Sequence, residues 1–216
     1  MRLNFALVGA AALLGFGSEV NADVYRDPDT GFTFSQYNAP ITTGSTSYIT
    51  FRIAIPSPAP SGQPYDAVLQ VVAPNVAGWV GLAWGGTMPN NPLQIGWANG
   101  ASAVTSVRRS TSHTAPSLDS SATLQLLSKG TKTNGTHWQY TAKCTGCTRF
   151  TTTGSTIKTL NPSGSNRLAL AYSKTKPSQP YSSSSPINVH DLFNYWDHDF
   201  AAAGNAQFEE LVTRNL

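Results

Sequence analysis

The sequence offers one methionine beyond the initiator that could act as a soft donor to a transition metal. Met88 lies in the segment 84–92, WGGTMPNNP, directly after an apolar run. Glycine, proline and asparagine are typical of turns, so this methionine is expected in a loop. A gap-filling core methionine is the usual alternative to a ligand, and position alone leaves both interpretations open.

Four histidines are the other candidate donors. His113 lies in a Ser/Thr-rich stretch, His137 adjoins a glycosylation triplet, His190 follows the Pro/Ser-rich segment 177–186, and His198 stands between two aspartates. None has the close spacing of a zinc or non-haem iron site. A surface or half-buried histidine is the common outcome for each, so spacing alone selects no ligand.

The two cysteines, Cys144 and Cys147, form a Cys-Thr-Gly-Cys unit. In a reducing compartment this unit would indicate a redox or zinc site, but export, which the first residues predict, favours a structural disulfide. A zinc site would need a second pair of ligands. Thr148 follows Cys147, so the Cys-x-x-Cys-His signature of covalent haem attachment is absent.

Motifs of the common enzyme classes are missing from the sequence. It contains no Gly-x-Ser-x-Gly elbow, phosphate loop or dinucleotide fingerprint, and its surroundings mark no carboxylate pair as a glycosidase couple. The net charge of +3 is scattered, and Arg108-Arg109 is the only basic doublet. We therefore expect no nucleic-acid partner.

The first 22 residues predict a signal peptide. A positive start precedes the apolar run 3–16, and small residues at 20 and 22 suit cleavage before Asp23. The run is too short to span a bilayer as an anchor, so a secreted protein without a membrane segment is expected. Asn134, in Asn-Gly-Thr at a predicted hairpin turn, is then a glycosylation candidate.

Residues 23–216 are expected to fold as one all-β domain, an antiparallel, immunoglobulin-like β-sandwich of two sheets. Short segments of strand-like alternation are separated by turn residues, and only 12% of residues are charged. Residues 56–64 and 177–186 are expected as loops, and 200–204 and 208–212 as short helical turns. Predicted strands cover 32–37, 48–55, 67–73, 79–84, 122–127, 138–142 and 168–172.

Taken as a whole, the sequence resembles the cytochrome domain of fungal cellobiose dehydrogenase, which also occurs alone or fused to other sugar dehydrogenases. The resemblance extends over essentially all of 23–216. The segments that carry it are 25–34 (YRDPDTGFTF), 78–88 (GWVGLAWGGTM), 134–138 (NGTHW), 144–147 (CTGC) and 190–193 (HDLF).

The resemblance implies a β-sandwich with one non-covalent haem b, whose iron has a methionine and a histidine as axial ligands. By position these are Met88 and His190, with His198 as the alternative histidine. His113 falls where the family has a tyrosine near a haem propionate, a departure that leaves Arg108 or Arg109 as possible propionate partners. The expected apolar walls of the haem site are Trp84, Leu93, Trp97 and Phe193.

The resemblance also implies electron transfer rather than catalysis by the chain itself. The donor would be a flavin- or quinone-dependent sugar dehydrogenase, and the acceptor a copper polysaccharide monooxygenase or another one-electron acceptor. We expect a monomer, either as a stand-alone cytochrome or as part of a longer dehydrogenase. The alternatives are a carbohydrate-binding sandwich, in which Trp97 would stack on sugars, and a structural sandwich without a ligand.

Overall fold

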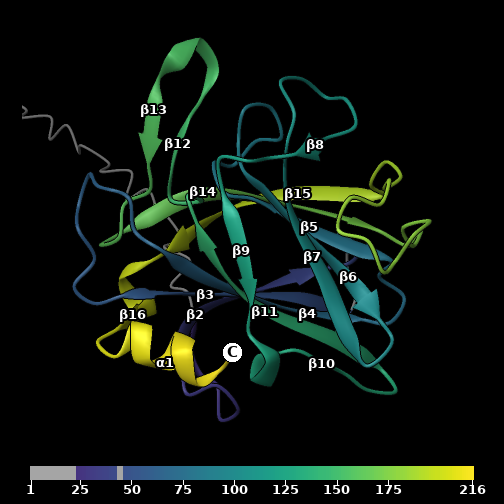
Figure 1. Ribbon diagram of the computed structural model, residues 1–216, viewed down its shortest axis with the longest axis horizontal. Coiled ribbons are helices and arrows are strands. Elements are labelled where there is room, and N and C mark those ends of the chain that lie inside the picture. Colours follow the sequence, from purple (N-terminus) through teal and green to yellow (C-terminus); the bar gives the residue numbers. More distant parts are fainter. Residues whose placement is uncertain (1–22, 43–45) are drawn as a thin grey trace, which may run out of the picture.

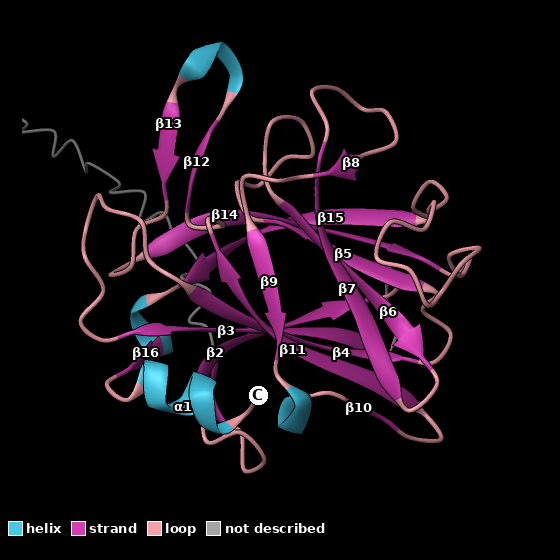
Figure 2. Cartoon of the chain, viewed as in Figure 1, coloured by secondary structure: helices cyan, strands magenta, loops and turns pink. Residues whose placement is uncertain are grey.

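Two β-sheets packed face to face dominate the computed structural model, which describes residues 23–42 and 46–216 (Figures 1 and 2). The predicted signal peptide, 1–22, lies outside these residues. The first sheet has the order β1 (Asp23–Arg26), β2 (Thr33–Pro40), β3 (Tyr48–Pro56), β4 (Ala67–Pro74), β11 (His137–Thr145) and β10 (Lys132–Thr133), with β16 (Gly204–Asn205) beside β3 and β9 (Thr123–Leu126) beside β11.

The second sheet carries the features that matter most for function. Its order is β15 (Leu192–Asp199), β14 (Ser165–Ser173), β5 (Trp79–Ala83), β6 (Leu93–Asn99), β7 (Ser102–Arg109) and β8 (Ser117–Leu118). All pairings in both sheets are antiparallel except that of β16 with β3. The predicted antiparallel sandwich is confirmed. The hairpin of β12 (Arg149–Thr151) and β13 (Ile157–Thr159) rises from one end of the molecule (Figure 1).

All seven predicted strands correspond to strands of the structure, namely β2, β3, β4, β5, β9, β11 and β14. The predicted helical turns near the C-terminus are also present, as the 3-10 turn Ala201–Ala203 and helix α1 (Phe208–Arg214). Strands β6, β7 and β15 were not predicted. Their buried rows include polar side chains such as Gln94, Ser106 and His198, which interrupt the apolar alternation.

The main core lies between the two sheets. Alternate residues of β5 and β14, including Val80, Leu82 and Leu170, point inward against Phe51 and Val71 of the first sheet. The other face of the second sheet is buried as well, under a separate apolar cluster of Trp79, Ala83, Leu93, Ile95, Trp97 and Ala169. Burial on both faces explains why 79–84 is an unbroken apolar run.

Two smaller predictions concern the first sheet and its turns. Cys144 and Cys147 are joined by a disulfide, as predicted, in a tight turn where Gly146 has φ of +91°. Asn134 is exposed between β10 and β11, and its Oδ1 accepts hydrogen bonds from the Thr136 and His137 amides. Among residues 23–42 and 46–216, no helix has the length and apolar character needed to cross a membrane.

Candidate functional site

A cavity of about 410 Å³ opens on the outer face of the second sheet. Its floor is made by small residues that alternate along two neighbouring strands, Gly81 and Ala83 of β5 and Ala169 and Ala171 of β14. A Cβ atom at Gly81 would reach toward Trp79 and Ile95, at 3.4 and 3.5 Å, within the same apolar surface. The small side chains therefore leave room for a ligand directly above the sheet.

Met88 reaches this cavity from the loop that joins β5 to β6. It packs against the outer apolar cluster, and its loop is closely tied. The buried Asn91 amide donates to the Pro89 carbonyl at 2.6 Å and to Thr87 Oγ1 at 3.0 Å. Lys158 Nζ donates to the Gly85 carbonyl at 2.9 Å, and burial lowers the pKa of Lys158. The thioether is thus held on an ordered loop.

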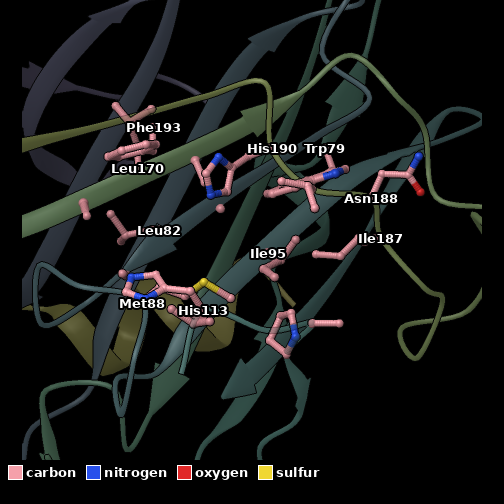
Figure 3. A pocket seen from close by; sticks show the side chains of 18 of the residues that line it. Trp79, Leu82, Met88, Ile95, His113, Leu170, Ile187, Asn188, His190 and Phe193 are labelled. Carbon is pink, nitrogen blue, oxygen red and sulfur yellow. The ribbon is translucent and has the colours of Figure 1, made fainter. Parts of the chain in front are cut away.

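His190 enters from the other end of β5. Tyr172 is opposite both Val80 of β5 and Leu192 of β15, so His190 lies near the start of β5, whereas Met88 follows its end. Figure 3 shows the His190 ring and the Met88 sulfur reaching the cavity from these two loops, with His113 on the Met88 side in this view. A thioether and an imidazole therefore share one apolar cavity.

The residue after His190 fixes its backbone. The Asp191 amide donates to the Tyr172 carbonyl at 2.8 Å, and Asp191 Oδ2 accepts from the Lys174 amide at 2.6 Å and from Ser173 Oγ at 3.1 Å. The Lys174 amide is the main reason why the pKa of Asp191 is lowered. The His190 ring meets Phe193 edge-on at 5.3 Å, which limits its orientation.

The cavity brings together five of the residues predicted for the haem site and leaves out four. Met88, Leu93, His113, His190 and Phe193 line it. The other four predicted residues, Trp84, Trp97, Arg108 and Arg109, are not part of its lining.

The two tryptophans among these four serve the fold rather than the cavity wall. Trp84 faces the core between the sheets, where its Nε1 donates to Gln94 Oε1 at 3.3 Å. Trp97 is fully buried, and its Nε1 donates to the Pro180 carbonyl at 2.7 Å. Trp97 therefore supports the Pro/Ser-rich loop that leads to His190.

The two arginines are also engaged elsewhere. Arg108 is only 4% exposed and donates from Nη2 to the carbonyls of Ser183 and Ser185. Arg109 donates to the carbonyls of Asn90 and Thr151 and lies 3.7 Å from Asp119 Oδ2. The guanidinium groups bind main-chain carbonyls, and neither arginine is among the residues that line the cavity.

His198, the alternative ligand, lies on the inner face of β15. Its Nδ1 accepts a hydrogen bond from Trp196 Nε1 at 3.0 Å, and it is 1% exposed. Burial lowers its pKa to about 4, against smaller opposing effects of the Ser35 backbone and Asp199. His198 is a neutral core residue that does not reach the cavity.

Several lining residues were not predicted from the sequence. They include Trp79, Ile95, Ile187, Asn188, Val189 and Tyr195. A usable signal was present, because small residues at 81, 83, 169 and 171 alternate in two strands that are otherwise apolar. Such a row on one face of a sheet marks a place where something other than a side chain packs.

The donor set and the cavity fit a flat, apolar iron cofactor. The volume lies within the range of cofactor sites, about 300–1,000 Å³. One thioether and one imidazole form an axial ligand pair that some cytochromes use. The only cysteines form a disulfide, so no thiol is available for covalent attachment.

Comparison with known proteins gives concordant results. The family model described as the cytochrome domain of cellobiose dehydrogenase matches residues 25–210. A pyrroloquinoline quinone-dependent pyranose dehydrogenase from Coprinopsis cinerea is 34% identical over 184 residues, or 85% of this chain and 24% of that protein. The chain thus spans about a quarter of this relative's length.

Two solved structures share the fold. The cytochrome b domain of pyranose dehydrogenase from Coprinopsis cinerea superposes with a TM-score of 0.76 and 27% identity, covering 90% of this chain and 95% of that one. The cytochrome domain of Myriococcum thermophilum cellobiose dehydrogenase gives a TM-score of 0.79 at 20% identity, covering 91% and 97%.

Proposed function

Because this chain belongs to the family of the cytochrome domain of cellobiose dehydrogenase, we propose that it binds one haem b without covalent links, between Met88 and His190. The family consists of electron-transfer modules of larger dehydrogenases, so haem-based electron transfer is the general role of this chain. The observation that carries the specific proposal is the shared apolar cavity, which Met88 and His190 enter from loops at opposite ends of β5.

The residues around the cavity suit reversible electron transfer. Haem supplies a one-electron change at its iron, and two protein ligands leave no open coordination position for a substrate. Asp191 and Phe193 restrain His190, and the tied loop 87–91 restrains Met88. The apolar floor excludes water, and the thioether favours the ferrous state relative to a second imidazole.

Further parts of the proposal concern the cell and the partners. We propose cleavage of residues 1–22, export, and glycosylation at the exposed Asn134. The electron donor would be a flavin- or quinone-dependent sugar dehydrogenase, and the acceptor a copper polysaccharide monooxygenase or similar one-electron acceptor. The pyranose dehydrogenase relative, of which this chain matches a quarter, supports a dehydrogenase as donor. We expect the chain to act as a monomer.

The carbohydrate-binding alternative loses the tryptophans on which it rested. In that alternative, tryptophans such as Trp97 would stack on sugar rings. All five tryptophans of the sequence are buried, and Trp97 is fully enclosed beneath the Pro/Ser-rich loop. No tryptophan is available to stack on a sugar.

The ligation is tested by single substitutions in the purified full chain. Met88→Ala should leave five-coordinate or water-ligated iron, lower the reduction potential and admit cyanide or imidazole. His190→Ala should lose haem more readily, because the imidazole is the stronger ligand. Absorption spectra before and after dithionite report both changes.

The control for the histidine assignment is His198→Ala. This variant is expected to be less stable but to keep the spectrum of six-coordinate iron. The proposed ligation is wrong if Met88→Ala leaves that spectrum unchanged, or if His198→Ala loses haem while His190→Ala keeps it.

A further inference from the structure

The adjacent arginines of β7 each bind one of the two loops that carry the proposed ligands. We infer that Arg108 and Arg109 are positioning residues, Arg108 for His190 and Arg109 for Met88. The inference rests on the proposed function, because it takes these two residues as the axial ligands. It assigns the doublet a role different from the propionate contact expected from the sequence.

Arg108 holds the long loop that precedes His190. Its Nη2 donates to the Ser183 carbonyl at 2.9 Å and to the Ser185 carbonyl at 2.7 Å, while its Nε donates to Ser106 Oγ at 3.0 Å. The loop is also closed on itself, since the Gln179 amide donates to Ser185 Oγ at 2.9 Å. Beyond Ser185 the chain lines the cavity and reaches His190.

The burial of Arg108 makes this contact unusual. The side chain is almost inaccessible to solvent, and burial lowers its pKa. Within the part of the chain that the structure describes, its guanidinium forms no ion pair and is satisfied by carbonyls and a hydroxyl. A buried cation without a carboxylate is costly unless its donors are satisfied, so Arg108 depends on these loop carbonyls and binds the loop firmly in return.

Arg109 holds the shorter loop that carries Met88. Its Nη2 donates to the Asn90 carbonyl at 3.2 Å and also to the Thr151 carbonyl of β12. Asn90 is further fixed, because its amide donates to the Ser110 carbonyl at 2.7 Å and its Nδ2 to Thr153 Oγ1 at 3.0 Å. Asn90 is two residues from Met88, so a shift of the Asn90 backbone would also displace the Met88 side chain.

Through Arg108 and Arg109, both ligand loops are therefore hydrogen-bonded to the same strand, β7. β7 is paired with β6 from Ser102, opposite Asn99, to Arg108, opposite Leu93, and Arg109 is paired with Ser117 of β8, so the strand provides a rigid base. A guanidinium presents several donors in a fixed plane, which suits it to hold two carbonyls at once. Iron ligands keep their geometry only when the groups behind them are themselves held.

The experiment compares Arg108→Gln, Arg109→Gln and Arg214→Gln in the haem-loaded full chain. Arg108→Gln should accelerate haem loss to an excess of apomyoglobin by about tenfold or more, the usual scale for groups that support metal ligands. It should preserve the far-red charge-transfer band of methionine-ligated ferric iron. Arg109→Gln should weaken that band, lower the reduction potential and tighten cyanide binding by about tenfold, with little change in haem loss.

Arg214→Gln is the matched control. It removes an arginine–carbonyl bond of the same kind, from Arg214 Nη2 to the Thr30 carbonyl at 3.2 Å, on α1 and away from the cavity. Haem loss, potential and cyanide affinity should equal those of the parent. Arg108→Lys and Arg109→Lys keep the charge and a hydrogen-bond donor but lose the planar fork, so each should show a smaller effect than the glutamine variant and serve where that variant fails to fold.

The inference is overturned if the two glutamine variants change haem loss and potential no more than Arg214→Gln does. It is also overturned if the effects are exchanged, with Arg108→Gln acting on the thioether bond and Arg109→Gln on haem retention. Failure of the proposed ligation would be seen separately, because Met88→Ala would then leave the spectrum unaltered.

Discussion

At the residue scale, the surroundings of two histidines separate their roles. His190 is half-buried, faces an apolar cavity and is anchored through the backbone of Asp191. His198 is buried between the sheets, where it accepts the Trp196 indole hydrogen on Nδ1. The first can bind a metal, whereas the second is held neutral in the core.

The low pKa of His198 predicts a loss of stability in mild acid. In the unfolded chain His198 has the ordinary pKa of 6.5, whereas in the fold the pKa is about 4, so the unfolded state binds the proton more tightly. The stabilisation is complete above pH 6.5, declines as the pH falls toward 4, and changes no further below that. The total is about 3 kcal/mol.

Urea unfolding of the parent and His198→Phe between pH 7 and pH 4.5 tests this prediction. The variant should lose most of this pH dependence, although it is less stable at pH 7 by about 1–3 kcal/mol because the Trp196 indole loses its acceptor. His137→Phe, at an exposed turn, should keep the parental dependence. Equal slopes for the parent and His198→Phe would contradict the assignment.

At the scale of single elements, β5 and β6 show how one sheet serves a core and a cavity at once. Gly81 faces outward onto the cavity floor, whereas Gly96 faces inward, where a Cβ would lie 2.3 Å from the Tyr140 ring. The two glycines are on neighbouring strands, since Gly96 is opposite Val80 and Ile95 opposite Gly81. Substitutions at these two glycines should therefore have different consequences.

We predict that Gly81→Leu prevents haem binding without unfolding the chain, because the new side chain fills the cavity floor. Gly96→Ala should instead destabilise the protein by about 1–3 kcal/mol through overpacking, while the folded fraction still binds haem. The haem-to-protein absorbance ratio and the urea midpoint of each variant measure the two effects. A haem-replete Gly81→Leu protein would show that the cofactor does not rest on this floor.

The alternation of apolar residues predicted the sandwich but not which face of a strand meets the ligand. Trp79 and Trp84 are five positions apart along the extended segment 79–84. Since successive side chains of a strand alternate between its two faces, they point to opposite faces. Trp84 was expected at the haem, yet it is Trp79 that lines the cavity while Trp84 fills the core. Because both faces of β5 are apolar, hydrophobicity alone does not distinguish them, and only the small residues at 81 and 83 mark the face that meets the cavity.

The candidate ligands depended on a different kind of information. Met88 and His190 emerged from the resemblance to a family, since their spacing carries no motif. The contacts of Arg108 and Arg109 were not predicted, because their partners are main-chain carbonyls of distant loops, which no sequence pattern indicates. Contacts of side chains with remote backbone become visible only in the folded chain.

At the scale of the whole molecule, the candidate site lies on one side. The cavity lies outside the second sheet, while helix α1 covers part of the first sheet through Phe208, Leu211 and Val212 (Figure 1). Val189, Phe193 and Tyr195 line the cavity and remain substantially exposed. A partner that exchanges electrons with the site would approach this side.

We predict that the isolated chain oxidises neither cellobiose nor other simple sugars. Closed coordination offers no place for a substrate, so electrons must come from a protein partner through a small, transient contact. Mixed with a flavin or quinone dehydrogenase and its sugar, the haem should become reduced, and an oxidised copper monooxygenase should reoxidise it. Stopped-flow absorbance follows both steps. Sugar oxidation by the chain alone would contradict the prediction.

The separation of the two ligand loops has a consequence for unfolding. Met88 and His190 are 102 positions apart (190 − 88), so with the proposed ligation the iron acts as a reversible cross-link that closes a large loop. A cross-link of this span is worth about 5 kcal/mol by the chain-entropy argument. Since a thioether binds ferrous iron more tightly than ferric iron, the cross-link should be stronger in the reduced protein. The urea midpoint should therefore be higher under dithionite than under ferricyanide, and equal midpoints would refute it. Reduction would then raise the free energy of unfolding, and oxidation would lower it by weakening the bond between Met88 and the iron.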